Sequence, residues 1–343
     1  MKKFLLLITI TATAFILKAQ NSQTPYLTKS LSSVNVQQVH VETSGGSIAV
    51  TGVDPSQAKI EVYIRGNNGN GDLSSDEIKK RLENYTIDIT TNNNTLTAVA
   101  KNKARFNDWK RGLSISFKIY VPKNVATDLS TSGGSIRLAN LSGNQEFRTS
   151  GGSLNVDNVS GKVDGKTSGG SVNITNSKDD IDLSTSGGSI EASNCNGNIR
   201  LSTSGGSLKL AALQGKIKAN TSGGTVNAND ISGELSAHTS GGSVRMKNLS
   251  CSLETSTSGG NIDVQIEKLG DYVRISNSGG DIDLHLPQNK GLDLDLNARK
   301  ISTGTLNNFN GKTDDDQVYG KVNGGGIPVE VKAGSGRINI MWD

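Results

Sequence analysis

The side chains in this chain that could do chemistry are few, and its three histidines come first. His40, His238 and His285 have no cysteine or other histidine at ligand spacing. A metal site needs several such ligands close together. The spacing therefore predicts hydrogen-bonded or solvated histidines, and it favours neither a metal site nor a cofactor site.

Serine is the most abundant nucleophile type, because Ser-Gly-Gly-Ser recurs along the chain. This motif is not the Gly-x-Ser-x-Gly elbow that presents an activated serine, and so many near-identical serines cannot all be nucleophiles. The repetition indicates a structural role. We therefore predict no catalytic residue.

Aspartates near the C-terminus offer a possible calcium site. They are the pairs Asp281/Asp283 and Asp293/Asp295 and the run 314–316. Carboxylate oxygens suit calcium. The Gly-Gly-x-Gly-x-Asp repeat of calcium-loaded repeat proteins is absent, so the sequence favours a calcium-free chain.

Residues 1–19 are organised like a secretory signal peptide. Lys2 and Lys3 precede an apolar run, and Ala19 is a small residue before the expected cleavage point. We therefore expect an exported protein in the periplasm, at the outer surface or outside the cell. No later segment approaches 18 continuous apolar residues, so we expect no integral membrane span after signal removal.

The charge balance argues against nucleic acid as a partner. The 343 residues carry a formal net charge of +4, and removing Lys2, Lys3 and Lys18 leaves 33 basic residues against 32 acidic ones. A nucleic-acid-binding chain would carry a basic patch or a strongly basic balance.

A single motif, Thr-Ser-Gly-Gly, organises most of the sequence. Eight copies follow one another at steps of 18 residues, which is the signature of a solenoid. An earlier copy begins at Thr43, a variant begins at Asn277, and Gly334-Ser335-Gly336-Arg337 resembles a degenerate last copy. The eight copies begin at Thr131, Thr149, Thr167, Thr185, Thr203, Thr221, Thr239 and Thr257.

Each unit, counted from its threonine, carries aliphatic residues at positions six and eight and again near positions fifteen and seventeen. Polar residues alternate with them, which predicts two half-buried strands per unit. The glycines permit positive φ and close backbone approach at one turn. Asparagine at position ten forms either a hydrogen-bonded ladder or an ordinary turn at the other. The fold class is all-β, a flattened parallel β-solenoid or single-stranded β-helix with about 18 residues per coil.

The repeats divide the chain into regions. We expect the signal peptide at 1–19, N-terminal coils and a capping region at 20–130, regular coils at 131–286, and degenerate coils with a cap at 287–343. The capping region contains one short helix at 75–84, because Ser74 and Glu77 form a capping-box pattern. Such a helix would cover an open end or side of the sheet.

The two cysteines test the register. Cys195 stands at position eleven of one unit, and Cys251 at position thirteen of a unit three layers away. At roughly 4.8 Å per layer the separation is about 14 Å. A disulfide needs Cα atoms within about 7 Å, so we predict two unpaired thiols.

A polysaccharide-cleaving enzyme is the strongest rival to a passive rod. Sugar clefts combine aromatic platforms with acid–base pairs. Between Thr131 and Ile301 the only aromatic residues are Phe147 and Tyr272. The uniform coils also lack long loops for cleft walls, so we predict a protein that is not an enzyme. One outward row could contact a partner or be an ordinary solvated face, and it comprises Arg137, Asn155, Asn173, Glu191, Lys209, Asn227 and Arg245.

The run from Lys118 to Asn124, the Thr-Ser-Gly-Gly repeats and the closing Gly-Ser-Gly-Arg-Ile-Asn-Ile resemble a bacterial family of exported β-strand-repeat proteins labelled "putative adhesin". The resemblance covers about Val34 to Trp342. It implies a β-solenoid at the cell envelope and supplies no catalytic residues. Members can carry membrane anchors, and we expect none in this chain after signal removal; retention of residues 1–19 as an N-terminal anchor helix is the alternative.

We therefore expect a non-enzymatic, exported envelope or secreted protein with an adhesin-like binding or scaffold role. Its partner would be an envelope, surface or matrix component. Two alternatives stay open: a carbohydrate-active β-helix protein that binds or cleaves glycans, and a periplasmic partner in envelope assembly or stress.

Overall fold

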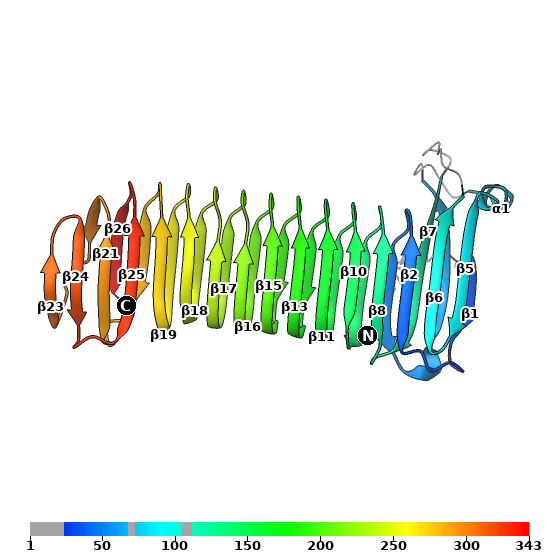
Figure 1. Cartoon of the computed structure of the whole chain (residues 1–343), viewed down its shortest axis with the longest axis horizontal. Coiled ribbons are helices and arrows are strands. Elements are labelled where there is room, and N and C mark those ends of the chain that lie inside the picture. The colour runs from blue at the N-terminus through cyan, green and yellow to red at the C-terminus, as the bar shows by residue number, and fades with distance from the viewer. Residues whose placement is uncertain (1–23, 68–72, 104–111, 343) are drawn as a thin grey trace, which may run out of the picture.

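The structure is a computed structural model that describes residues 24–67, 73–103 and 112–342. The predicted signal peptide at 1–19 lies outside these ranges. The described chain is mostly β-strand with one α-helix, and the strands lie side by side in one long row (Figure 1). Most strand pairs are parallel, and antiparallel pairs occur only toward the two ends of the row.

The central strands pair at a constant offset, except for the last pair, Val244–Thr257 with Ile262–Asn277, where the register shifts. Val163 pairs with Ile181, and Ile181 pairs with Ile199, so each step is the 18-residue repeat. We call one such unit of two strands and two turns a coil. The strands of this part are β8 (Ala126–Thr131), β9 (Ile136–Ser142), β10 (Gln145–Thr149), β11 (Leu154–Thr167), β12 (Val172–Thr175), β13 (Lys178–Thr185), β14 (Ile190–Ser193), β15 (Asn196–Thr203), β16 (Leu208–Asn220), β17 (Val226–His238), β18 (Val244–Thr257) and β19 (Ile262–Asn277).

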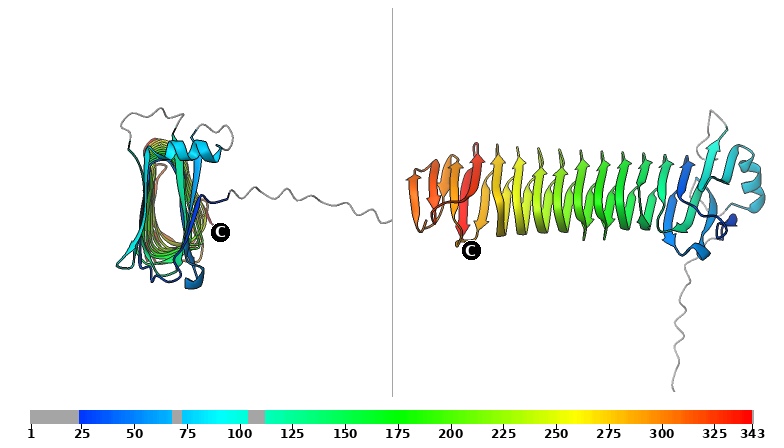
Figure 2. Two further views of the ribbon diagram at one scale, coloured as in Figure 1. Left: turned by 90° about the vertical axis from the view of Figure 1, so that its right-hand side faces the viewer. Right: turned by 60° about the horizontal axis from the view of Figure 1, so that its bottom comes forward.

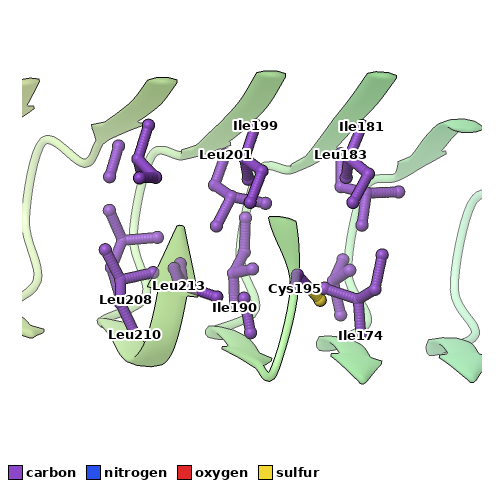
Figure 3. Close-up of a cluster of buried hydrophobic side chains, with 14 of the residues drawn as sticks. Ile174, Ile181, Leu183, Ile190, Cys195, Ile199, Leu201, Leu208, Leu210 and Leu213 are labelled. Carbon is purple, nitrogen blue, oxygen red and sulfur yellow. The ribbon is translucent and has the colours of Figure 1, made fainter. Parts of the chain in front are cut away.

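The coils are flattened, with two strand faces that enclose the core (Figure 2). The first face carries position six, for example Leu154 paired with Val172, and the second face carries position fifteen, for example Val163. Aliphatic side chains from both faces meet between them, as Figure 3 shows for Ile190 and Ile199. The inward positions predicted from the alternation are confirmed.

Several inward positions depart from the aliphatic rule and are compensated locally, as Gln145 and Gly165 show. Gln145 is fully buried, and its amide donates to the Val125 carbonyl at 2.8 Å and accepts from Thr127 at 2.8 Å. Gly165 has no side chain because the Phe147 ring from the preceding coil fills its space. A Cβ at Gly165 would overlap that ring and the Leu183 side chain.

The Thr-Ser-Gly-Gly corner is joined from coil to coil by its threonine. Thr149 Oγ1 donates to the carbonyl of Gly134 in the preceding coil at 2.8 Å, and the N–H of Gly152 donates to the same Oγ1 at 3.3 Å. The pattern recurs through Thr257, and Asn277 reproduces it with its side-chain amide. These threonines are buried, so the residue that opens the motif is a structural bridge.

The glycines of this corner are needed for close approach. A Cβ on Gly152 would overlap the carbonyl of Gly134. Left-handed backbone, which the sequence suggested here, occurs instead at the opposite turn, where Gly161 has φ 97° and Asn158 has φ 53°. The expectation of positive φ at Ser-Gly-Gly was therefore wrong, because the chain turns there in ordinary extended and bend conformations.

The position-ten residues form only part of the possible ladder. Asn158 Nδ2 donates to Asn140 Oδ1 at 2.8 Å, and Asn194 donates to Asn176 at 3.4 Å. Ala212 occupies the same left-handed position with φ 52° and interrupts the row. Left-handed geometry is thus the common requirement, and the ladder is an addition where asparagine allows it.

At the N-terminal end the first Thr-Ser-Gly-Gly copy stacks directly on the regular coils. Thr43 pairs with Thr131 and Ile48 pairs with Ile136, and β6 and β7 pair with the outer edges of β2 and β3 as a cap. Its antiparallel pairs β4–β7 and β5–β6 close this end. The elements are β1 (Leu27–Ser30), β2 (Gln38–Thr43), β3 (Ile48–Val53), the 3-10 turn η1 (Pro55–Gln57), β4 (Lys59–Gly66), α1 (Ser75–Leu82), β5 (Tyr85–Asn92), β6 (Thr95–Asn102) and β7 (Leu113–Pro122).

The predicted helix is present and slightly shorter than expected. Ser74 is its N-cap, and its hydroxyl accepts from the Glu77 N–H at 3.3 Å, which confirms the capping-box start. The helix ends at Leu82 and not at Asn84, because the last two residues turn into β5.

At the C-terminal end the last copy is inserted within the stack. Its β25 lies between β19 and β21, and its β26 lies between β20 and β22. Ala333 thereby stacks on Asn277, so sequence order does not give stacking order. The elements are β20 (Ile282–Leu286), β21 (Leu292–Asn297), β22 (Lys300–Ser302), β23 (Phe309–Thr313), β24 (Gln317–Val322), β25 (Ile327–Ala333) and β26 (Arg337–Trp342).

The corner threonines should contribute measurably to stability. Thr203→Val keeps the shape but leaves the Gly188 carbonyl and the Gly206 N–H without their partner. We expect a loss of about 1–3 kcal/mol in unfolding free energy, measured by denaturant titration. Ser204→Ala, at the exposed neighbouring residue, is the control and should change it by less than about 0.5 kcal/mol. Equal effects of the two substitutions would contradict the role assigned to the threonine.

The cysteines should be free and unreactive in the native protein. Both are unpaired and buried, and burial raises the pKa of Cys251 to about 12 and also raises that of Cys195. The thiolate is the reactive form, so iodoacetamide at pH 8 should label neither residue before unfolding and both after it. An intramolecular disulfide in the purified protein, seen by mass spectrometry, would show that the coil register is incorrect.

Candidate functional site

The seven residues of the predicted partner-contact row form one line on the first face. Each pairs in register with its neighbour one coil away. All seven side chains point outward and are exposed or half-buried. The structure therefore brings together residues that lie far apart in sequence, and the row is Arg137, Asn155, Asn173, Glu191, Lys209, Asn227 and Arg245.

Contacts within this row are weak enough to be exchanged for a ligand. Lys209 Nζ lies 2.8 Å from Glu191 Oε1, with 68% and 52% of the two side chains exposed. Ion pairs this exposed contribute about 0–1 kcal/mol. Asn173 Nδ2 donates to Asn155 Oδ1 at 3.2 Å. The row is thus a mixed, polar and lightly connected surface that a partner could contact at little cost.

A second outward column, on the second face, was not found from the sequence. Position sixteen of successive coils aligns carboxylates in register, next to His40 at one end and Arg200 at the other. Glu146, Asp164 and Asp182 each have a lysine or arginine beside them, and Asp128 lies 2.9 Å from His40 Nδ1. Reading position sixteen down the repeats would have revealed it. The carboxylates are Asp128, Glu146, Asp164 and Asp182.

The histidines have ordinary polar environments. His40 Nδ1 contacts Asp128 as above, and His238 lies between Ser236 and Ser256 at 3.0 and 2.8 Å. His285 lies on β20. Within the described ranges, no group of three or more histidine, cysteine, aspartate or glutamate residues could hold a metal ion.

Two of the C-terminal aspartates that suggested calcium, Asp281 and Asp283, bind the inserted last coil. Asp293 and Asp314 instead lie near Lys321 and Lys312. Asp281 Oδ2 accepts from Arg337 Nη2 at 2.8 Å, and Asp281 Oδ1 accepts from the Arg337 backbone N–H at 2.8 Å. Asp283 accepts from Asn339 at 2.7 Å. The hydrogen bonds from Arg337 lower the pKa of the Asp281 carboxyl. These contacts fasten β26 to β20.

An aromatic and charged cluster lies on the outer surface of the N-terminal cap. Lys59 Nζ is 2.8 Å from Glu61, whose other oxygen accepts from Tyr63 Oη at 2.9 Å. The ammonium groups of Lys118 and Lys59 lie 4.5 Å and 5.1 Å from the ring centres of Tyr63 and Tyr120. The cluster joins β4 to β7 across their antiparallel pair.

The carboxyl group of this cluster is held ionised by its partners. Burial is the largest influence on Glu61 and opposes its charge, yet hydrogen bonds from Lys59 and Tyr63 leave its pKa below the ordinary value. Burial, followed by the hydrogen bond to Glu61, raises the pKa of Tyr63 to about 12. The cluster is therefore an ion pair between Lys59 and Glu61, with Tyr63 and Tyr120 in contact with it.

Over the described ranges no helix has both the length and the apolarity needed to cross a membrane.

Stacked parallel coils with polar outward rows and capped ends define a β-repeat protein. Within that class the chain belongs to the Toastrack DUF4097 family, whose model matches residues 68–341, and this confirms the resemblance seen in the sequence. The chain is also similar to the crystal structure of a "putative cell adhesion protein" from Clostridium sporogenes ATCC 15579. That match has 12% identity, a TM-score of 0.21, and covers 93% of this chain and 100% of that chain. No curated protein matches this chain.

The Asp281–Arg337 pair predicts a pH-dependent contribution to stability. The pKa of Asp281 is lowered in the folded state, so its stabilising effect is present above its ordinary pKa of about 4 and is lost as the pH falls below it. Asp281→Asn should lower the melting temperature at pH 7, and the difference from the unmodified protein should shrink toward pH 3.

The control for this experiment is Asp263→Asn. Asp263 is a surface aspartate one layer away, where it pairs in register with Asp283. The ion pair of Arg337 is with Asp281 and not with Asp263. A melting-temperature difference for Asp281→Asn that stays constant from pH 7 to pH 3 would contradict the ion-pair explanation.

Proposed function

We propose that this protein is an exported, flattened β-solenoid that binds an envelope, surface or matrix component and acts as an adhesin-like or scaffold protein without catalysis. The observation that carries the proposal is the flat first face, on which seven polar side chains lie in one in-register row. Such a row offers a long contact surface and no concave site for chemistry.

The distribution of reactive groups supports a binding role over a catalytic one. Histidines and carboxylates that could act as acid or base are engaged in exposed ion pairs or in contacts between coils. A general acid or base would be expected in a cleft with a shifted pKa near neutrality. The signal-like residues 1–19 support export.

The proposal predicts that charge on the first face governs attachment. A triple variant, Arg137→Ser, Lys209→Ser and Arg245→Ser, should bind cells of the source strain at least about fivefold more weakly than the unmodified protein. Binding is measured with fluorescently labelled protein on a deletion strain. Raising the salt concentration should reduce binding of the unmodified protein in the same direction.

The matched control removes the same number of cations from the second face through Lys162→Ser, Arg200→Ser and Lys218→Ser. Each triple variant breaks one exposed ion pair. Equal loss of attachment in both variants would show that total charge, and not the row, is responsible. A deletion strain that attaches to cells and matrix as well as its parent would refute the adhesin-like role.

A further inference from the structure

The turn η1 projects from the row of turns near the N-terminal end (Figures 1 and 2). On each side of this projection the surface is hollowed. The hollow on the β1 side has a volume of about 550 Å³, and the hollow on the side of the regular coils has about 520 Å³. Gln57 and Val53 line both, so η1 forms a wall shared by two neighbouring hollows.

The wall is held in place by backbone hydrogen bonds. The N–H of Gln57 donates to the Asp54 carbonyl at 2.9 Å, and the N–H of Ala58 donates to the Pro55 carbonyl at 3.2 Å. The end of β1 is tied to the same turn, because the N–H of Leu31 donates to the Ala58 carbonyl at 2.8 Å. The hollow is therefore formed in advance of any ligand, which lowers the cost of binding.

The first hollow combines one aromatic ring with hydroxyl and amide groups. Tyr120, half-buried on β7, contributes the ring, and the polar groups come from β1 and η1. Antiparallel pairing of β1 with β4 and of β4 with β7 brings these segments together. The polar lining consists of Thr28, Ser30, Ser56, Gln57 and Lys59.

The charge in this hollow is already compensated. Lys59 Nζ lies 2.8 Å from Glu61 and 5.1 Å from the centre of the Tyr120 ring. An anionic ligand would compete with Glu61 for the ammonium group, and a cationic ligand would meet Lys59. The chemistry that remains is that of a neutral molecule with many hydroxyl groups and an apolar ring face.

The second hollow continues the same chemistry past Gln57. Asn140 and Asn158 line it, with Asn158 Nδ2 donating to Asn140 Oδ1 at 2.8 Å. Asp54 and Lys123, one acidic and one basic, line it as well, so its charged groups are of both signs. Carboxamides and hydroxyls both donate and accept, as sugar hydroxyls do. Leu141, an apolar residue of this lining, is buried, so apolar anchors for a peptide side chain are scarce.

We propose that the two hollows on either side of η1 are a binding site for a neutral oligosaccharide, with a sugar ring packed on Tyr120 and further units passing Gln57 toward Asn158. Each hollow falls within the range of about 300–1,000 Å³ that is usual for ligand sites. This proposal rests on the proposed function, because it assumes that the chain is a binding protein, and it adds the chemical class of the ligand. It requires no catalytic group.

Isothermal titration calorimetry of the full purified protein with four neutral tetrasaccharides tests this site. The probes are chitotetraose, cellotetraose, maltotetraose and mannotetraose. At least one should bind. Tyr120→Ala should weaken its affinity about tenfold, whereas Tyr120→Phe should retain it because the ring remains. Gln57→Ala, on the exposed turn, should also weaken binding and is independent of any folding defect caused by loss of the tyrosine.

The matched control is Tyr319→Ala, because Tyr319 is an exposed tyrosine on β24 at the opposite end of the molecule. The Tyr319→Ala variant should bind the tetrasaccharide with the same affinity as the unmodified protein. The proposal is overturned if no tetrasaccharide binds, if binding is unchanged by both Tyr120→Ala and Gln57→Ala, or if an unstructured peptide binds there in preference to every sugar. If the protein attaches to cells but binds no sugar, the oligosaccharide site is refuted and the adhesin-like role stands. If it binds sugar but does not attach to cells, the adhesin-like role is refuted and the oligosaccharide site stands.

Discussion

The corner threonine and the second glycine of its motif set the constraint on which the other features depend. The threonine hydroxyl joins the carbonyl of the preceding coil to an N–H of its own coil. The glycine at that corner approaches the preceding backbone so closely that a Cβ would overlap it. Because an unpaired buried polar group is costly, a coil that slipped by one residue would lose these bonds and turn its aliphatic side chains outward. Each corner thereby fixes the register, including the Asn277 corner that follows the irregular pairing of β18 with β19.

Because the register is fixed, the residue pattern of the repeat determines the composition of the outer faces and of the core. Side chains at equal positions stand above one another, so a polar position becomes a continuous row and an inward position becomes a column of core. Like charges in adjacent layers would repel each other. The position-sixteen carboxylates are tolerated because three of them have a lysine or arginine beside them, such as Arg200 for Asp182, and the fourth, Asp128, has a hydrogen-bond partner in His40. Surface charge and core packing are therefore two results of the same stacking.

The structure of the repeated coils could be predicted from the sequence, whereas the pairing of the segments outside the regular repeats could not. Aliphatic positions such as Ile190 and Leu208 followed from periodicity alone, as did the separation of the two cysteines. The bridging role of Thr203 was not predicted, because its hydrogen bond to the Gly188 carbonyl depends on how closely two coils approach at the corner. The insertion of β25 between β19 and β21, and the stacking of Thr43 on Thr131, depend on pairings between distant segments that no local pattern encodes.

The hollows beside η1 could not be foreseen for the same reason, and this has a consequence for recognition. Tyr120 and Ser30 are far apart in sequence and meet only because β1 and β7 both flank β4. The hollow recorded on the regular second face, beside Asp164 and Asp182, measures about 230 Å³, whereas the two hollows beside η1, where the repeat is broken, measure about 520 and 550 Å³. A larger hollow increases the area that a small ligand buries. In a repeat protein of this kind the uniform coils supply length and rigidity, and selectivity for small ligands belongs to the irregular cap.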